Sequence, residues 1–174
     1  MDRQALEEGI RNVPDFPKPG IQFKDITPIL LDPDLFKKAL DALAEPIPTE
    51  TVDKIVGIDA RGFIFGAALA DRLNVGFIPV RKKGKLPYKT RSVAYTLEYG
   101  EAEIELHEDA VNKGDKIWLV DDLLATGGTA RAAADLIEQM DGELLAMSFL
   151  VELAFLEGRK RLGDASPVHA TLIY

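Results

Sequence analysis

The 174-residue chain has the length of one compact domain and a formal net charge of −8 at pH 7. This acidic balance argues against broad binding to nucleic acid or to anionic membranes. No apolar run approaches the roughly 18 residues of a membrane-spanning helix, and no secretory signal is visible, so we expect a cytoplasmic protein. The chain has no cysteine, which excludes disulfides, thiol catalysis and thiolate metal sites.

Strand and helix patterns alternate along the chain, after an irregular start. Residues 1–10 predict a short helix. The proline-rich stretch 13–20 predicts irregular backbone, because proline fixes φ and lacks the backbone donor. Asp32 then predicts the N-cap of a helix whose first residue is Pro33 and which ends before Pro46.

The rest of the chain predicts an α/β fold. Strands joined through helices imply right-handed crossovers, and therefore a mostly parallel twisted sheet with helices on both faces. No repeat, low-complexity segment or linker divides the chain, so we predict a single domain over residues 1–174. The expected strands are 54–58, 76–80, 93–99, 101–107, 116–120, 144–151 and 168–173, and the expected helices are 62–73, 129–140 and a turn near 155–162.

Positive charge gathers in one segment of this acidic chain. Six basic residues fall between 81 and 91, and no acid follows them until Glu98. Residues 81–92 have neither the helical nor the strand period, which predicts a long mobile loop. A solvated loop and a patch that binds a small polyanion are both compatible with this composition.

The strands 93–99 and 101–107 turn at Gly100 and predict an antiparallel hairpin. In its second strand, acidic residues alternate with apolar ones, which predicts a solvent-exposed face. Those acids are Glu101, Glu103 and Glu105. The two histidines, His107 and His169, each lie alone in a strand pattern, and we interpret both as structural.

The segment 117–130 carries the most informative pattern in the chain. An apolar strand ends in Asp121 and Asp122, and a small-residue loop then opens a helix. Ligands of open α/β sheets bind outside the carboxyl ends of the strands, where carboxylates can accept hydrogen bonds from sugar hydroxyls or interact with a metal ion. The predicted loop consists of Ala125, Thr126, Gly127, Gly128 and Thr129.

Two glycines in this loop let backbone N–H groups converge on an anion, which the helix N-terminus also attracts. Sugar-binding carboxylates beside a phosphate loop predict a ribose 5-phosphate pocket, whereas the alternative is a purely structural strand-to-helix turn. No lysine follows the glycines, so a nucleotide triphosphatase is not indicated.

The string Val120–Thr129 resembles the phosphoribosyl pyrophosphate signature of type I phosphoribosyltransferases, in the form typical of the adenine phosphoribosyltransferase family. The resemblance covers essentially the whole chain. It implies the type I phosphoribosyltransferase fold, with a hood formed largely by residues 1–30 and a flexible loop at 81–99. The other matching segments follow in the same order as in the family: 16–28, 57–63, 81–87, 95–100 and 150–153.

The resemblance implies that phosphoribosyl pyrophosphate binds with Mg²⁺ carried on the substrate and with no metal site in the protein itself. Asp121 and Asp122 would hold the ribose hydroxyls, and the loop after them the 5-phosphate. Tyr88 stands where the family commonly has glycine, which predicts a stiffer loop. The pyrophosphate would be held, in this or in a neighbouring subunit, by Ala60, Arg61, Arg81, Lys82, Lys85 and Tyr99.

The resemblance also implies an adenine site. Phe23 would stack on the purine, backbone groups near Gln22 and Lys24 would read its edge, and Leu153 would cover its opposite face. Glu98 would be the general acid/base of the reaction. From the pattern alone, Phe23 is equally well a core phenylalanine, and Glu98 a solvated strand glutamate.

The implied reaction converts adenine and phosphoribosyl pyrophosphate to AMP and pyrophosphate, in a homodimer. Two alternatives remain: a transferase for another base such as hypoxanthine or xanthine, and a non-catalytic regulator that senses ribose phosphate and binds nucleic acid. Side chains do not distinguish adenine from hypoxanthine here. The net charge of −8 and the lack of an added DNA-binding domain argue against the regulator, so we expect no nucleic-acid or membrane partner.

Overall fold

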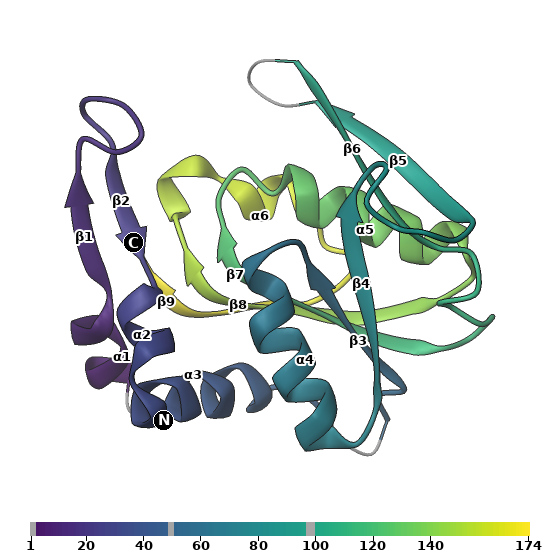
Figure 1. Ribbon diagram of the computed structural model, residues 1–174, viewed down its shortest axis with the longest axis horizontal. Coiled ribbons are helices and arrows are strands. Elements are labelled where there is room, and N and C mark those ends of the chain that lie inside the picture. The colour runs from purple at the N-terminus through teal and green to yellow at the C-terminus, as the bar shows by residue number, and fades with distance from the viewer. Residues whose placement is uncertain (1–2, 49–50, 97–99) are drawn as a thin grey trace.

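A seven-stranded sheet forms the centre of the molecule (Figure 1). The structure is a computed structural model that describes residues 3–48, 51–96 and 100–174. The strand order is β5-β6-β4-β3-β7-β8-β9. The five strands from β4 to β9 in this order run parallel, and β6 joins β4 and β5 in antiparallel fashion. The predicted, mostly parallel sheet is therefore confirmed. Its strands are β3 (Lys54–Ile58), β4 (Gly76–Lys82), β5 (Thr90–Thr96), β6 (Glu101–His107), β7 (Lys116–Leu124), β8 (Glu143–Glu152) and β9 (Val168–Ile173).

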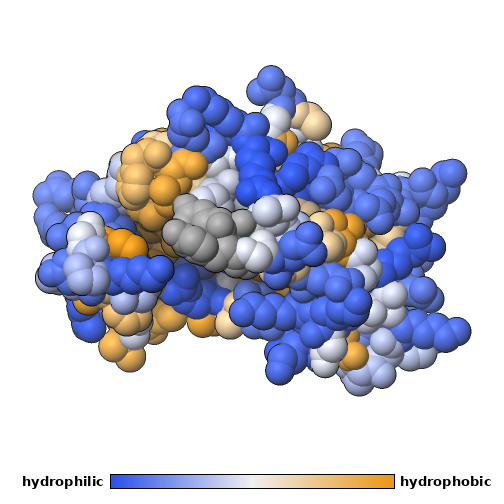
Figure 2. Space-filling view, turned by 90° about the horizontal axis from the view of Figure 1, so that it is seen from above, coloured by the Kyte–Doolittle hydropathy of each residue, from blue (hydrophilic) through white to orange (hydrophobic). Residues whose placement is uncertain are grey.

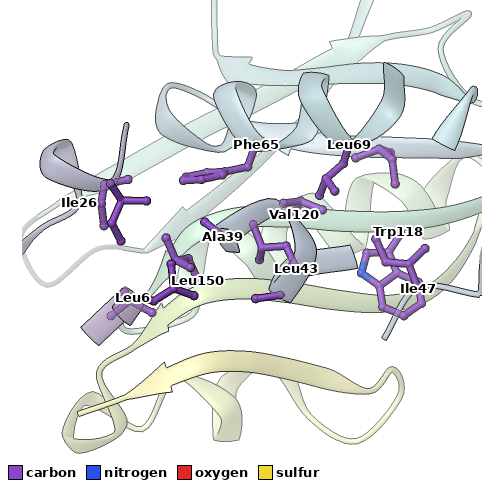
Figure 3. Close-up of a cluster of buried hydrophobic side chains, with 14 of the residues drawn as sticks. Leu6, Ile26, Ala39, Leu43, Ile47, Phe65, Leu69, Trp118, Val120 and Leu150 are labelled. Atoms are coloured by element: carbon purple, nitrogen blue, oxygen red, sulfur yellow. The ribbon is translucent and has the colours of Figure 1, made fainter. Parts of the chain in front are cut away.

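Helices cover both faces of this sheet, because side chains of its central strands point alternately to the two sides. On β7, Trp118 and Val120 pack with side chains of α1 to α4, as Figure 3 shows for Phe65 and Leu69. Ile117 and Leu119 of β7 pack with side chains of α5 and α6 on the other face of the sheet. The helices are α1 (Arg3–Gly9), α2 (Thr27–Leu31), α3 (Pro33–Ala44), α4 (Arg61–Leu73), α5 (Gly128–Gln139) and α6 (Gly158–Leu162), with a 3-10 turn η1 (Ala154–Leu156).

The start of α3 confirms the predicted cap. The Asp32 carboxylate accepts hydrogen bonds from the backbone N–H groups of Asp34 and Leu35, at 2.9 and 3.0 Å. Pro33 occupies the first helical position, where a missing donor does no harm. None of the helices within the described ranges is long and apolar enough to cross a membrane.

The N-terminal segment is more regular than predicted. Strands β1 (Arg11–Pro14) and β2 (Gln22–Asp25) form a separate antiparallel ribbon, so the prediction of irregular backbone was wrong for Val13 and Pro14. Both strands of a two-stranded ribbon are edges, where a proline needs no ladder donor. Helix α2 was not predicted, because five residues are too few to show a helical period. The ribbon stands at the left of Figure 1, beside the C-terminus.

The basic segment is also more ordered than its composition suggested. Strand β4 continues to Lys82 and β5 begins at Thr90, so the long loop predicted over 81–92 shrinks to residues 83–89. The predicted antiparallel hairpin is confirmed, with Thr96 opposite Glu101 at its end.

Glu105 of β6 corrects the predicted exposed face, since it is only 4% exposed. The turn folds over this side chain, whose carboxylate accepts hydrogen bonds from the N–H groups of Lys85 and Leu86 and from the hydroxyl of Thr90, each at 3.1 Å. Burial raises the pKa of Glu105, but these hydrogen bonds outweigh burial and hold the pKa below its usual value. The turn is thus built around an ionised, buried carboxylate.

Candidate active site

The site lies where the strand order of the parallel sheet changes direction. From β3 the chain continues to β4 on one side, and from β7 it continues to β8 and β9 on the other. Connections that leave in opposite directions open a crevice outside the carboxyl ends of the two central strands. A cavity of about 200 Å³ occupies this place. Its lining comprises Ile58, Asp59, Ala60, Arg61, Asp121, Asp122, Leu123, Leu124, Ala125, Thr126, Gly127, Gly128, Thr129 and Ala130.

The predicted phosphate loop forms one wall of this cavity. Gly127 has a φ of 77°, in the left-handed region, and precedes α5 without a side-chain cap on the first turn. The first N–H groups of a helix have no partner within the helix. An anion in the cavity can therefore accept hydrogen bonds from these N–H groups. The dipole of the 12-residue helix α5 adds a further attraction for negative charge.

The paired carboxylates form the floor of the site. Both belong to β7, which continues to Leu124, so the predicted strand was too short. Asp122 is 5% exposed, and its Oδ2 lies 2.6 Å from Nε of Arg61. The Oδ1 of Asp121 accepts the N–H of Asp122 at 2.9 Å. A Cβ on Gly62 would lie 2.7 Å from that same oxygen, so this glycine, which the sequence analysis missed, leaves room for Asp121.

The two carboxylates differ in their electrostatic surroundings. Burial raises the pKa of Asp121 well above its usual value, and the neighbouring Asp122 carboxylate raises it further. Burial raises the pKa of Asp122 as well, and the Arg61 guanidinium beside it offsets only part of that rise. A negative charge on this pair therefore resides more readily on Asp122, and a proton more readily on Asp121.

Asp121→Asn should raise the melting temperature of the protein at neutral pH and weaken the binding of phosphoribosyl pyrophosphate, the phosphoribosyl donor. A carboxyl whose pKa is raised by folding binds its proton more tightly in the folded state, so stability falls as pH rises above the unfolded pKa of about 3.9. An asparagine removes this loss and keeps the acceptor oxygen for Asp122. Loss of one hydrogen bond between the neutral Asp121 carboxyl and the ribose should raise the dissociation constant of phosphoribosyl pyrophosphate by roughly 2- to 10-fold.

Thermal unfolding from pH 4 to pH 8 measures the first effect. The variant's advantage should be small at pH 4 and should grow with pH to a plateau. Asp41→Asn is the control, since Asp41 forms an exposed ion pair with Arg72 on the outside of α3 and α4. An advantage that is constant with pH, or a loss of stability at neutral pH, would contradict the placement of the proton on Asp121.

Arg61 and Arg81 bring positive charge to the turn between β3 and α4. Arg81 Nε lies 2.9 Å from Oδ2 of Asp59, and its Nη1 donates to the carbonyl of Lys85 at 3.2 Å. The Asp59–Ala60 peptide bond in this turn is cis. Lys82 and Lys85 are exposed and do not line the cavity formed by the described residues. The structure thus brings Arg81 to the turn between β3 and α4, where pyrophosphate is predicted to bind. Lys82 and Lys85 lie further along the basic segment.

The predicted adenine residues approach the cavity from two sides. The Arg61 guanidinium carbon lies 5.9 Å from the ring centroid of Phe23, which connects the ribbon to the site. Gln22 is exposed next to it. The Lys24 ammonium donates to Asn12 at 2.7 Å and lies 3.6 Å from the ring centroid of Tyr174. The side chain of Lys24 is therefore engaged within the hood, so only its backbone is available to a base.

Leu153 and the hairpin complete the surroundings of the cavity. The N–H of Leu153 donates to the carbonyl of Leu124 at 2.9 Å. The Thr129 hydroxyl donates to Tyr95 Oη at 3.0 Å, and Arg161 donates to the carbonyl of Thr96, also at 3.0 Å. The last described residues of β5 are therefore fixed beside the phosphate loop. Glu98 and Tyr99 lie outside the described residues, so their roles stay predictions.

The face of the molecule seen in Figure 2 is mainly hydrophilic, with a group of hydrophobic residues on its left. A larger cavity of about 410 Å³ lies elsewhere, between α3 and strands β8 and β9. Its lining contains none of the predicted site residues. The smaller cavity is the better candidate, because only there do the carboxylates, the loop and Arg61 surround one space.

Comparison with known proteins agrees with this geometry. The phosphoribosyl transferase domain family matches residues 29–161. The adenine phosphoribosyltransferase of Thermosipho africanus is 54% identical, over 97% of this chain and 99% of its own. The crystal structure of the Rhodothermus marinus adenine phosphoribosyltransferase has a TM-score of 0.94 and 52% identity, over 99% of this chain and 98% of that chain.

A Saccharomyces cerevisiae adenine phosphoribosyltransferase, solved with D-2,5-dideoxy-2,5-imino-altritol 1,6-bisphosphate and adenine, has a TM-score of 0.91 and 43% identity. That similarity covers 97% of each chain. With half of its residues shared with such relatives along nearly its whole length, the chain belongs to the phosphoribosyltransferase family and, within it, to the adenine phosphoribosyltransferases.

Proposed function

We propose that this chain transfers the 5-phosphoribosyl group of phosphoribosyl pyrophosphate to adenine and releases AMP and pyrophosphate. The observation that carries this proposal is the cavity between the ends of β3 and β7, which gathers two carboxylates, an uncapped phosphate loop and an arginine. The yeast relative's complex with adenine supports the choice of base.

In this reaction the bond from the ribose C1 to pyrophosphate breaks, the pyrophosphate leaves with the electron pair, and a bond from adenine N9 to C1 forms. Positive charge develops on the sugar as the leaving group departs. Asp122, paired with Arg61, would stabilise that charge as a carboxylate, while Asp121 and Asp122 together would hold the ribose hydroxyls. The loop Ala125–Thr129 would hold the 5-phosphate, and Arg61 with Arg81 the leaving pyrophosphate.

A proton must leave adenine as the new bond forms, and Glu98 is the residue we assign to receive it. Phe23 would stack on the purine ring, with Leu153 on the other side of the base. Lys82, Lys85 and Tyr99 would add contacts to the pyrophosphate once it is bound. Mg²⁺ would enter on the diphosphate, since it prefers oxygen ligands and keeps several waters.

The same proposal includes a homodimer that works in the cytoplasm. Light scattering of the purified protein tests the dimer, and a chelator series with restored Mg²⁺ tests the metal. Activity that persists without any divalent ion would remove Mg²⁺ from the scheme.

The decisive experiment offers four bases in turn. Purified protein with Mg²⁺ and phosphoribosyl pyrophosphate should make AMP from adenine far faster than nucleotides from hypoxanthine, guanine or uracil. Equal or faster turnover of another base would reassign the substrate. Ribose-phosphate binding with no turnover of any base would favour the regulator instead.

A further inference from the structure

The back of the phosphate loop rests on the short helix α6, an arrangement that the sequence analysis did not foresee. A Cβ on Gly158 would lie 2.2 Å from the carbonyl oxygen of Ala125, and a Cβ on Gly127 would lie 2.5 Å from the carbonyl oxygen of Gly158. The two backbones are therefore as close as glycine allows at both positions. Any shift of Gly158 along this direction moves the loop with it.

The side chain of Arg159, the residue after Gly158, anchors this part of α6. Arg159 forms a forked pair with the Glu152 carboxylate, with Nε at 2.8 and 2.9 Å from the two oxygens and Nη2 at 2.7 Å from one of them. Its Nη1 also donates to the carbonyl of Val168 at 2.6 Å. Arg159 thus ties α6 to the end of β8 and to the start of β9.

The buried Glu152 carboxylate fixes the position of the Arg159 guanidinium. It is the last residue of β8 and is only 4% exposed, so its carboxylate needs a charged partner. A planar guanidinium with several donors fixes both distance and direction, which a single ammonium does not. A helix of five residues has little stability of its own, so its position depends on such contacts.

We propose that Arg159 is a positioning residue for the 5-phosphate, which acts through Gly158 on the loop Ala125–Thr129. The inference rests on the proposed function, because it takes the anion in this loop to be the 5-phosphate of donor and product. It assigns part of the affinity for phosphate to a side chain that lines the 410 Å³ cavity and does not line the candidate site.

The test compares ligands with and without the phosphate. In Arg159→Met, the calorimetric dissociation constant of AMP should rise by on the order of 10- to 100-fold, with a matching rise in KM for the donor. The dissociation constant of adenine and kcat at saturating donor should change less than about twofold. Arg159→Lys should recover part of the AMP affinity, since it keeps one charged contact with Glu152.

Arg72→Met is the matched control, because Arg72 pairs with Asp41 between α4 and α3, and it should leave AMP binding unchanged. If Arg159→Met does not fold, Gly158→Ala tests the contact between α6 and the phosphate loop, since the added methyl must displace the carbonyl of Ala125. Equal weakening of AMP and adenine, or unchanged AMP binding in a folded Gly158→Ala variant, would overturn the inference. A wild-type protein that binds AMP without making it would refute the proposed function and leave this test intact.

Discussion

Gly127→Val should abolish donor binding while adenine binding persists. Gly127 has a φ of 77°, where a branched residue costs about 1–3 kcal/mol, and its Cβ would lie 2.5 Å from the Gly158 carbonyl oxygen. The loop must therefore move away from the position that directs its N–H groups at the phosphate. Loss of two such hydrogen bonds, at about 1.5–3 kcal/mol each, corresponds to roughly a 10²–10⁴-fold loss of affinity.

Calorimetric titration with the donor, with AMP and with adenine checks this result. Gly114→Val is the matched control, because Gly114 also has a positive φ but has no atom within 4 Å of its Cβ position. Gly114→Val shares the backbone strain of Gly127→Val but lacks its collision with the Gly158 carbonyl. Unchanged donor affinity in Gly127→Val would mean that the phosphate binds elsewhere.

Glu98→Gln should lower kcat by on the order of 10²–10⁴-fold, or about 3–5 kcal/mol of barrier. Glutamine keeps the size and the hydrogen-bonding capacity of glutamate but cannot accept the proton that adenine loses. The dissociation constants of adenine and donor should stay nearly unchanged. Tyr95 and Thr96, the last described residues of β5, contact Thr129 of the phosphate loop and Arg161 of α6, respectively.

Single-turnover rates, with adenine and donor both saturating, separate chemistry from product release. Glu101→Gln serves as the comparison, since Glu101 is an exposed residue of the same hairpin. Rates within about threefold of wild type in Glu98→Gln would assign the proton to water or to a substrate phosphate.

The sequence predicted the parts of the fold that depend on local periodicity. The parallel strands, the long helices and the cap at Asp32 follow from patterns within about fifteen residues, and the structure confirms them. The juxtaposition of Arg61 with Asp122 was also predictable, because Arg61 follows β3 and Asp122 lies near the carboxyl end of the neighbouring β7. The family resemblance supplied the roles of those residues.

What the sequence did not reveal depends on contacts between distant segments. Glu105 alternates with apolar neighbours like any exposed strand residue, and only the turn that folds over it buries its carboxylate. Gly158 looked like an ordinary residue of a helical turn, although it allows a close approach by Ala125, a residue far away in the chain. A glycine beside a forked Arg–Glu pair leaves no periodic signal, so such a support is found only in three dimensions.

The buried carboxylate of Glu105 also decides how the basic segment can respond to a ligand. Fixing the backbone of one residue removes about 1–2 kcal/mol of conformational entropy. The turn over residues 83–89 loses this freedom when the protein folds, since Glu105 holds it from inside. Binding of a diphosphate then involves little further ordering of this turn.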